Sequence, residues 1–199
     1  MSADVRVCFV GDSFVAGVGD PLLLGWAGRL GQRAHAAGVP LTSYNLGVRR
    51  QTSAEVLARF AAECAPRLPS SCTGRVVLSF GVNDAMVEHG VPRVDPEESA
   101  ANLTKLLGQA AERGWPVLMV APPPVDDAAH NARTAELDER FAAICAAAEV
   151  PYLRVHTALR ESAVWMREVR AGDGAHPGAA GYDALAALAL PQWLAWLGH

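Results

Sequence analysis

Apolar runs alternate with helix-like patterns along the 199 residues of the chain. Five of these runs are short, rich in β-branched or bulky apolar side chains, and closed by glycine, proline or polar turns. Such runs are typical of buried strands. The predicted strands cover residues 5–10, 41–46, 75–80, 116–121 and 150–155.

Helical patterns follow the predicted strands. The clearest helix start lies at residues 95–98 (Asp-Pro-Glu-Glu), which supply a capping side chain, a first-turn proline and two acids at the positive end of the helix. This helix is expected to run to about residue 113. Thr52 or Ser53 can cap another helix. The remaining predicted helices cover residues 22–37, 132–148 and 179–197, the last with an expected kink at Pro191.

Strands separated by helices predict repeated βαβ units. The expected fold is therefore α/β, a three-layer α/β/α sandwich with a five-stranded parallel sheet between two helical layers. A chain of 199 residues fits one domain, so residues 1–199 are expected to form a single unit. In such folds, reactive residues gather at the carboxyl ends of the strands, where candidate residues should therefore lie.

The composition narrows the expected partners. The formal net charge is −4 and no basic stripe is present, so a nucleic-acid partner is not expected. The mean hydropathy is +0.13, but the most apolar stretch, residues 179–197, contains Asp183, Pro191 and Gln192. It therefore lacks the roughly 18 uninterrupted apolar residues that a membrane span needs, and no membrane span is expected.

The amino terminus and the cysteines suggest a compartment. No basic region precedes a long apolar stretch before Gly11, so no secretion signal is predicted, although a signal removed from a trimmed sequence stays open. The four cysteines are dispersed and form no CxxC pair, which favours a reducing, cytoplasmic location. A pairing of Cys64 with Cys72 stays open for an exported protein.

Three fragments carry candidate chemistry. Ser13 directly follows the first predicted strand, where its hydroxyl could act as a nucleophile or simply cap a turn. Asn83 follows the third strand, where its amide could stabilise an oxyanion or form an Asx turn. Asp173 and His176 lie three residues apart in a glycine-rich loop, so the acid could orient the histidine as a base; the alternative is a surface turn with an incidental histidine.

The other histidines carry no comparable pattern. None of them has an acid at similar loop spacing, and no HExxH or paired spacing indicates a metal site. These histidines are His35, His89, His130, His156 and His199. No metal and no cofactor are therefore expected.

Taken together, the fragments resemble the SGNH hydrolases, or GDSL-type esterase/lipase family, over residues 5 to about 190. Four blocks carry the resemblance in order: GDSF at 11–14, NLGVRRQTS at 45–53, GVND at 81–84 and DGAHP at 173–177. The resemblance implies a flavodoxin-like fold. It also implies Ser13 as nucleophile, His176 as base and Asp173 as its orienting acid.

The resemblance further implies an oxyanion hole made by the Ser13 backbone N–H, a backbone N–H of the second block and the Asn83 side chain. The second block departs from the family pattern, because Arg50 stands where the family usually has a second glycine. The Arg50 N–H can replace that donor only if the backbone there does not require a positive φ. The Arg50 side chain could favour an anionic substrate, or point to solvent and form a salt bridge.

The leading functional hypothesis is a serine esterase that cleaves carboxylic esters of short to medium acyl chains through an acyl-Ser13 intermediate. The expected partner is a small-molecule ester. The expected substrate contacts are Phe14, Gly47, Ala85, Met86 and Pro123. An acyltransferase using the same residues stays open, as does a non-catalytic ligand-binding module. A homo-oligomer also stays open, because Trp193, Trp196 and Leu197 either pack inward or form a subunit contact.

Overall fold

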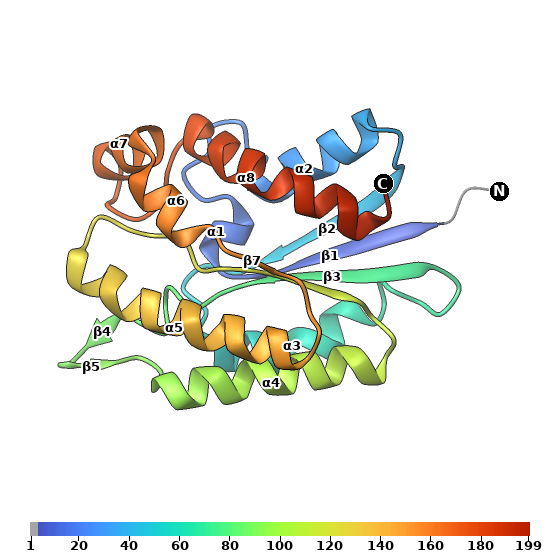
Figure 1. Cartoon of the computed structure of the whole chain (residues 1–199), viewed down its shortest axis with the longest axis horizontal. Helices are drawn as coiled ribbons and strands as arrows, with labels where there is room; N and C mark the ends of the chain where they lie inside the picture. Colours follow the sequence, from blue (N-terminus) through green and yellow to red (C-terminus); the bar gives the residue numbers. More distant parts are fainter. Residues whose placement is uncertain (1–3) are drawn as a thin grey trace.

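The computed structural model describes residues 4–199. Residues 1–3 are predicted to belong to the domain and to carry no secretion signal, and they lie outside the described residues. A five-stranded sheet with the order β2-β1-β3-β6-β7 crosses the molecule, and all neighbouring strands are parallel (Figure 1). Counted along the chain, this is the 2-1-3-4-5 order of flavodoxin-like folds. The strands are β1 (Val5–Gly11), β2 (Leu41–Gly47), β3 (Thr73–Ser79), β6 (Val117–Val120) and β7 (Tyr152–Leu153). The predicted α/β fold is confirmed.

Helices cover both faces of the sheet (Figure 1). One layer contains α2 (Gly25–Ala36), α6 (His156–Glu161), α7 (Ala163–Ala171) and α8 (Ala179–Leu197). The other layer contains α3 (Ser53–Cys64), α4 (Pro96–Glu112) and α5 (Ala128–Ala147). Side chains of β1 alternate between the two layers: Val7 and Phe9 pack into the first core, Cys8 and Val10 into the second. Burial on both faces explains why this strand is apolar throughout.

Helix starts follow the capping residues. Asp95 accepts a hydrogen bond from the Glu97 N–H, and α4 begins at Pro96 as predicted. Thr52 and Glu55 form a capping box at the start of α3. α5 begins four residues before the predicted position, because Asp127 caps it by accepting from the His130 N–H.

α2 begins at Gly25 rather than at residue 22. The buried carboxylate of Asp20 accepts hydrogen bonds from the N–H groups of Leu22, Leu24 and Gly25, which satisfies these donors outside a helix. Leu23 has a φ of 57°, which interrupts a right-handed helix at that point. The segment before α2 is therefore a turn built around Asp20.

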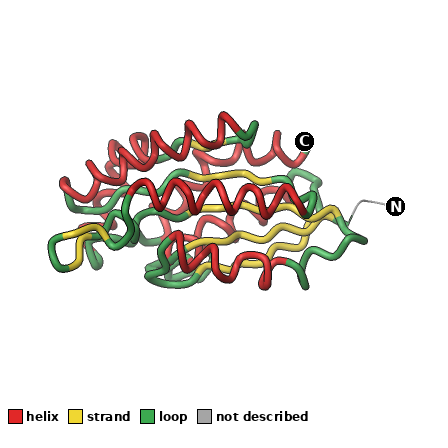
Figure 2. The backbone as a smooth tube through the Cα atoms, turned by 90° about the horizontal axis from the view of Figure 1, so that it is seen from below, coloured by secondary structure: helices red, strands yellow, loops and turns green. Residues whose placement is uncertain are grey.

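The structure contains elements that the hydrophobic pattern did not predict. These are α1 (Ser13–Ala16), α6, α7, β4 (Val87–Glu88) and β5 (Val91–Pro92). β4 and β5 form a short antiparallel hairpin that projects beyond the carboxyl ends of the main strands (Figure 2). α1 begins directly after β1, so it places Ser13 at the same end of the sheet.

The carboxyl-terminal helix α8 keeps its predicted bounds and continues through Pro191. Trp193 is fully buried against Phe9, so this residue packs inward rather than at a subunit contact. Within residues 4–199, no helix is long and apolar enough to cross a membrane. The four cysteines are free thiols, and Cys64 is not bonded to Cys72.

Candidate active site

Ser13, His176 and Asp173 meet at the carboxyl end of the sheet. His176 Nε2 lies 2.7 Å from Ser13 Oγ, and His176 Nδ1 lies 2.7 Å from Asp173 Oδ2. Ser13 is the first residue of α1, whereas Asp173 and His176 come from the loop between α7 and α8. Ser13 and His176, which are 163 positions apart in the sequence, thus belong to one continuous series of hydrogen bonds.

The loop that carries the acid and the base is shaped by the acid itself. Asp173 Oδ1 accepts hydrogen bonds from the backbone N–H groups of Ala175 and His176, at 3.0 and 2.9 Å. Gly174 has a φ of 80°, a conformation that glycine adopts without strain. The loop therefore folds the carboxylate back onto the imidazole that follows it.

The hydrogen bonds at Asp173 also determine its charge. Partial burial opposes ionisation, but the backbone N–H and the ring of His176, with the Ala175 N–H, lower the Asp173 pKa to about 2. The carboxylate is therefore ionised at neutral pH and binds a protonated Nδ1. Nε2 is then free to accept the proton of the Ser13 hydroxyl.

Aromatic side chains support the histidine. The Phe14 ring lies 4.8 Å from the His176 ring, and it stacks on the fully buried Trp165 at 6.3 Å. Trp165 Nε1 donates to the carbonyl of Pro124, which fixes the indole. Phe14 therefore has a packing role in addition to the substrate contact expected from the sequence.

Asp12 lies beneath the serine and is 1% exposed. One of its oxygens accepts from the Phe14 N–H at 2.9 Å and caps α1. Burial raises the pKa of Asp12 to about 7; the Phe14 hydrogen bond opposes this rise and the nearby charge of Asp84 adds to it. Asp12 is therefore a second titratable group beside the Ser13 hydroxyl, one that the sequence reasoning did not single out.

Asn83 lies between Asp12 and the loop after β2. Its amide nitrogen is 3.0 Å from the Gln51 carbonyl oxygen and 3.3 Å from Asp12 Oδ2. The next residue, Asp84, is buried and accepts from the Ser53 N–H and the Ser99 hydroxyl, which anchors this turn to α3 and α4. The structure thus brings Asn83 to the site with its amide already oriented.

Arg50 occupies the other predicted oxyanion position with a φ of 65°. The expected condition, a backbone without positive φ, is therefore not met; the Arg50 N–H keeps the direction that it would have with glycine only while arginine holds this left-handed conformation, at a cost of about 1–2 kcal/mol. Its side chain is 70% exposed and forms an ion pair with Glu88 at 3.2 Å. The structure shows the salt bridge expected as one alternative for this side chain, which also lines the cavity beside Ser13.

A comparison with known protein families gives the family of the chain. The profile of the GDSL-like lipase/acylhydrolase family matches residues 9–184, which is most of the chain. The chain belongs to this family. No curated protein sequence matches it.

Solved structures share the fold of this GDSL-like chain. A lipase/acylhydrolase from Enterococcus faecalis superimposes with a TM-score of 0.75, at 23% identity over 98% of this chain and 96% of that one. TesA gives a TM-score of 0.79, at 23% identity over 96% and 99% of the two chains. A catalytic mutant of Axe2, an acetylxylan esterase from Geobacillus stearothermophilus, gives 0.80 at 16% identity over 97% and 95%. At these identities the likeness is one of fold.

A cavity of about 500 Å³ opens beside Ser13 in this family member. Phe14 and Met86 line it, as expected from the sequence, together with Arg50, Asn83 and the three residues of the hydrogen-bonded chain. The start of α5 and the turn before it add lining residues that the sequence reasoning missed. These are Val125, Asp126, Asp127 and His130. They follow β6, so their place after a strand end was the available signal.

Three expected substrate contacts lie outside this cavity lining. Gly47 packs against the backbone of α1, where a Cβ atom would lie 2.1 Å from the Ala16 nitrogen. Ala85 is 4% exposed and its carbonyl accepts from Arg133. Pro123 is buried after β6. These residues build the walls behind the site rather than its surface.

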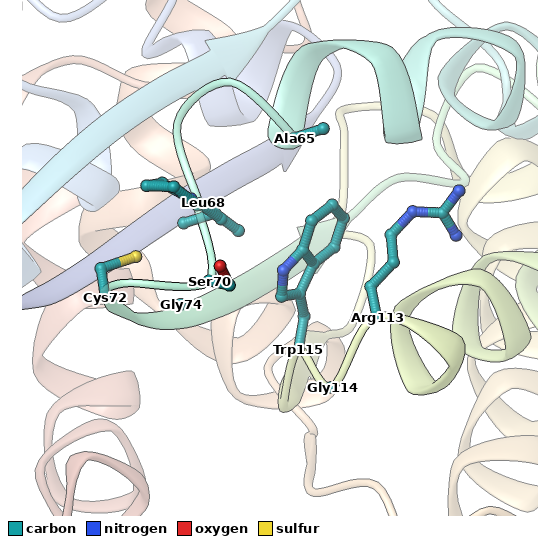
Figure 3. A pocket seen from close by; sticks show the side chains of 9 residues that line it. Ala65, Leu68, Ser70, Cys72, Gly74, Arg113, Gly114 and Trp115 are labelled. Carbon is teal, nitrogen blue, oxygen red and sulfur yellow. The ribbon is translucent and has the colours of Figure 1, made fainter.

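A second cavity, of about 530 Å³, lies at the amino-terminal side of β3 and holds Cys72, Arg113 and Trp115 (Figure 3). It is formed by the turns before β3 and β6, at the end of the sheet opposite Ser13. Among residues 4–199, no group of three or more metal-ligating side chains is found. Ser13, His176 and Asp173 line the cavity at the carboxyl end of the sheet and not this second one.

Proposed function

We propose that this GDSL-like protein hydrolyses carboxylic esters through an acyl-Ser13 intermediate. The observation that carries the proposal is the continuous chain from Asp173 through His176 to Ser13, with both contacts at 2.7 Å. A serine hydroxyl needs such an adjacent base to act as a nucleophile. The ionised Asp173 supplies the orientation and the charge that the imidazolium requires.

In the proposed first half-reaction, His176 Nε2 takes the Ser13 proton while Oγ attacks the ester carbonyl carbon. The carbonyl oxygen becomes an oxyanion in the tetrahedral intermediate. His176 then gives its proton to the leaving alcohol as the bond between carbon and that alcohol oxygen breaks. In the second half-reaction, water takes the place of the serine hydroxyl and releases the acid.

The oxyanion would be held by backbone N–H groups at Ser13 and Arg50 and by the Asn83 amide. Donors of this kind act because they are already oriented where negative charge develops. The Gln51 carbonyl fixes the Asn83 amide at 3.0 Å, while the contact with Asp12 is longer at 3.3 Å. The longer contact is the one that a substrate oxyanion would replace.

The cavity favours a small acyl group. Phe14, Val82, Met86 and Val125 give it apolar walls, and its volume of about 500 Å³ is that of a small-ligand site. We therefore propose esters of short to medium acyl chains as substrates. A series of p-nitrophenyl esters of increasing chain length would show an optimum in kcat/KM within that range.

The test of the catalytic proposal is covalent labelling. An organophosphonate directed at serine nucleophiles should add one adduct mass to the intact protein, mapped to Ser13, and the Ser13→Ala protein should stay unlabelled. The Ser13→Ala protein should also lose esterase activity. Full esterase activity in that variant would overturn the proposal. Unlabelled parent enzyme that forms ester from an added alcohol faster than it hydrolyses substrate would instead indicate acyl transfer.

A further inference from the structure

Arg93 links the β4–β5 hairpin to the loop that carries Arg50. Its Nη1 donates to the Arg50 carbonyl oxygen at 2.8 Å, across 43 positions of sequence. The Arg93 side chain is 17% exposed, although the hydrogen bond itself lies at the solvent-exposed surface of the loop. The family resemblance gives Arg93 no role, and no sequence pattern pointed to it.

Arg93 is itself held from two elements. Its Nε lies 3.6 Å from Glu88 on the hairpin, and its Nη2 lies 3.7 Å from Glu55 on α3. Its backbone N–H donates to the Met86 carbonyl at 2.8 Å, which closes the hairpin. The two carboxylates attract the planar guanidinium from two sides, and within residues 4–199 its one side-chain hydrogen bond goes to the Arg50 carbonyl oxygen.

The Arg50 peptide needs such a partner. A residue with a side chain at a φ of 65° is strained and tends to relax toward negative φ, which would turn the peptide groups on either side. The carbonyl of the next residue, Gln51, holds the Asn83 amide. Rotation at Arg50 would therefore disturb two of the three proposed oxyanion donors at once.

We propose that Arg93 is a positioning residue, which holds the Arg50 backbone in its left-handed conformation so that the loop keeps its oxyanion donors in place. It stabilises an arginine in a conformation that glycine adopts without strain. This inference rests on the proposed function, because it assigns Arg93 to the stabilisation of the oxyanion. Arg93 itself touches no reacting atom.

The experiment is a double-mutant cycle between Arg93 and Arg50. Arg93→Ala should lower kcat about tenfold or more, up to the roughly 10²-fold loss that a misplacement of about 1 Å can cause, and should change KM less than about threefold. The Arg50→Gly substitution makes positive φ easy without the arginine contact. Arg93→Ala introduced into the Arg50→Gly background should therefore lower kcat by less than about threefold.

The matched control is Arg113→Ala. Arg113 Nη1 also donates to a backbone carbonyl, that of Gln109 at 2.8 Å, but at the opposite end of the sheet. Its replacement should leave kcat unchanged. Arg93→Met keeps much of the apolar stem and has no donor for the Arg50 carbonyl, so it gives a second variant should Arg93→Ala fail to fold.

Amide hydrogen exchange of residues 48–52 gives a readout that does not depend on activity. It should be faster in Arg93→Ala than in the parent and unchanged in Arg113→Ala. An unchanged kcat in folded Arg93→Ala or Arg93→Met protein, or an equal loss in the Arg50→Gly background, would overturn this inference alone. Esterase activity that persists in Ser13→Ala would overturn the proposed function, and with it the role in oxyanion binding.

Discussion

At the scale of single residues, the buried acid Asp12 lies one position before the proposed nucleophile. It caps α1 through the Phe14 N–H and faces the Asn83 amide, so it touches two parts of the site. Burial raises its pKa from 3.8 to about 7. Folding therefore favours the protonated carboxyl, and Asp12 links the stability of the site to pH.

Asp12→Asn should remove this pH dependence. Because the folded pKa lies above the unfolded value, the contribution of Asp12 to stability is fully present below about pH 3.8 and is lost as pH rises through about 7. The parent should lose stability relative to Asp12→Asn over that window, with a slope of at most about 1.4 kcal/mol per pH unit. Urea unfolding of both proteins across the window measures it.

Asp173→Asn is the matched control, because the pKa of Asp173 is lowered to about 2. Its contribution is present above the unfolded pKa and is lost only as pH falls through about 2, so its sign is opposite. A difference in stability between the parent and Asp12→Asn that stays constant across the window would contradict a raised Asp12 pKa in the folded protein.

At the scale of elements, the packing of α1 on the end of β2 positions the serine. Asn45 donates to the Val15 carbonyl at 2.7 Å and accepts from the Gly47 N–H at 3.0 Å, which ties the strand to the helix. At Gly47 the backbones are so close that a Cβ atom would lie within 3 Å of three backbone atoms of Val15 and Ala16. The second sequence block therefore acts partly through this close approach.

Gly47→Ala should push α1 away from β2. We expect a loss of about 1–3 kcal/mol or more in the free energy of unfolding, with a fall in kcat because Ser13 begins the displaced helix. Gly108→Ala is the matched control, since no atom lies within 4 Å of the added Cβ on the exposed face of α4. It should gain about 0.5–1 kcal/mol. Equal effects of the two substitutions in urea unfolding would contradict the close-packing argument.

Local signals in the sequence predicted most of these elements. The capping residues Asp95 and Thr52 mark the starts of α4 and α3. The apolar run of β1 by itself indicates a strand that is buried on both faces. The small elements were missed because their residues carry weaker patterns. The β4–β5 hairpin turns at His89 and Gly90, both with positive φ, and a histidine gives little sign of such a turn.

The residues of the candidate site also fall into two groups, those that local sequence signals indicate and those that they do not. Ser13, Asn83 and His176 follow strand ends or lie in short motifs, so the sequence could point to them, and the structure brings them together. Arg93 meets Arg50 only because the hairpin folds across 43 residues, and no local pattern reports such a contact. Gly47 was expected at the substrate surface, although its small size serves the packing of α1.

At the scale of the whole molecule, a buried arginine joins segments from opposite ends of the chain. Arg29 on α2 pairs with Asp20, whose side chain is fully buried, and with Asp183 on α8 at 2.8 Å. Its Nη2 also donates to the carbonyl of Ala179, the first residue of α8, at 3.1 Å. The loop with His176 ends at that helix start, so this cluster connects the Asp20 turn to the segment that carries the base.

Arg29→Ala should be strongly destabilising, because it leaves the Asp20 carboxylate buried without its partner. Removing one member of a buried pair typically costs about 3–5 kcal/mol, whereas an exposed pair contributes at most about 1 kcal/mol. Arg140→Ala, which breaks the exposed pair with Glu97, is the control. Urea unfolding should separate the two variants by several kcal/mol. A loss below about 1 kcal/mol in Arg29→Ala would mean that water or a rearranged Asp20 replaces the guanidinium, and would contradict the stabilising role of this cluster.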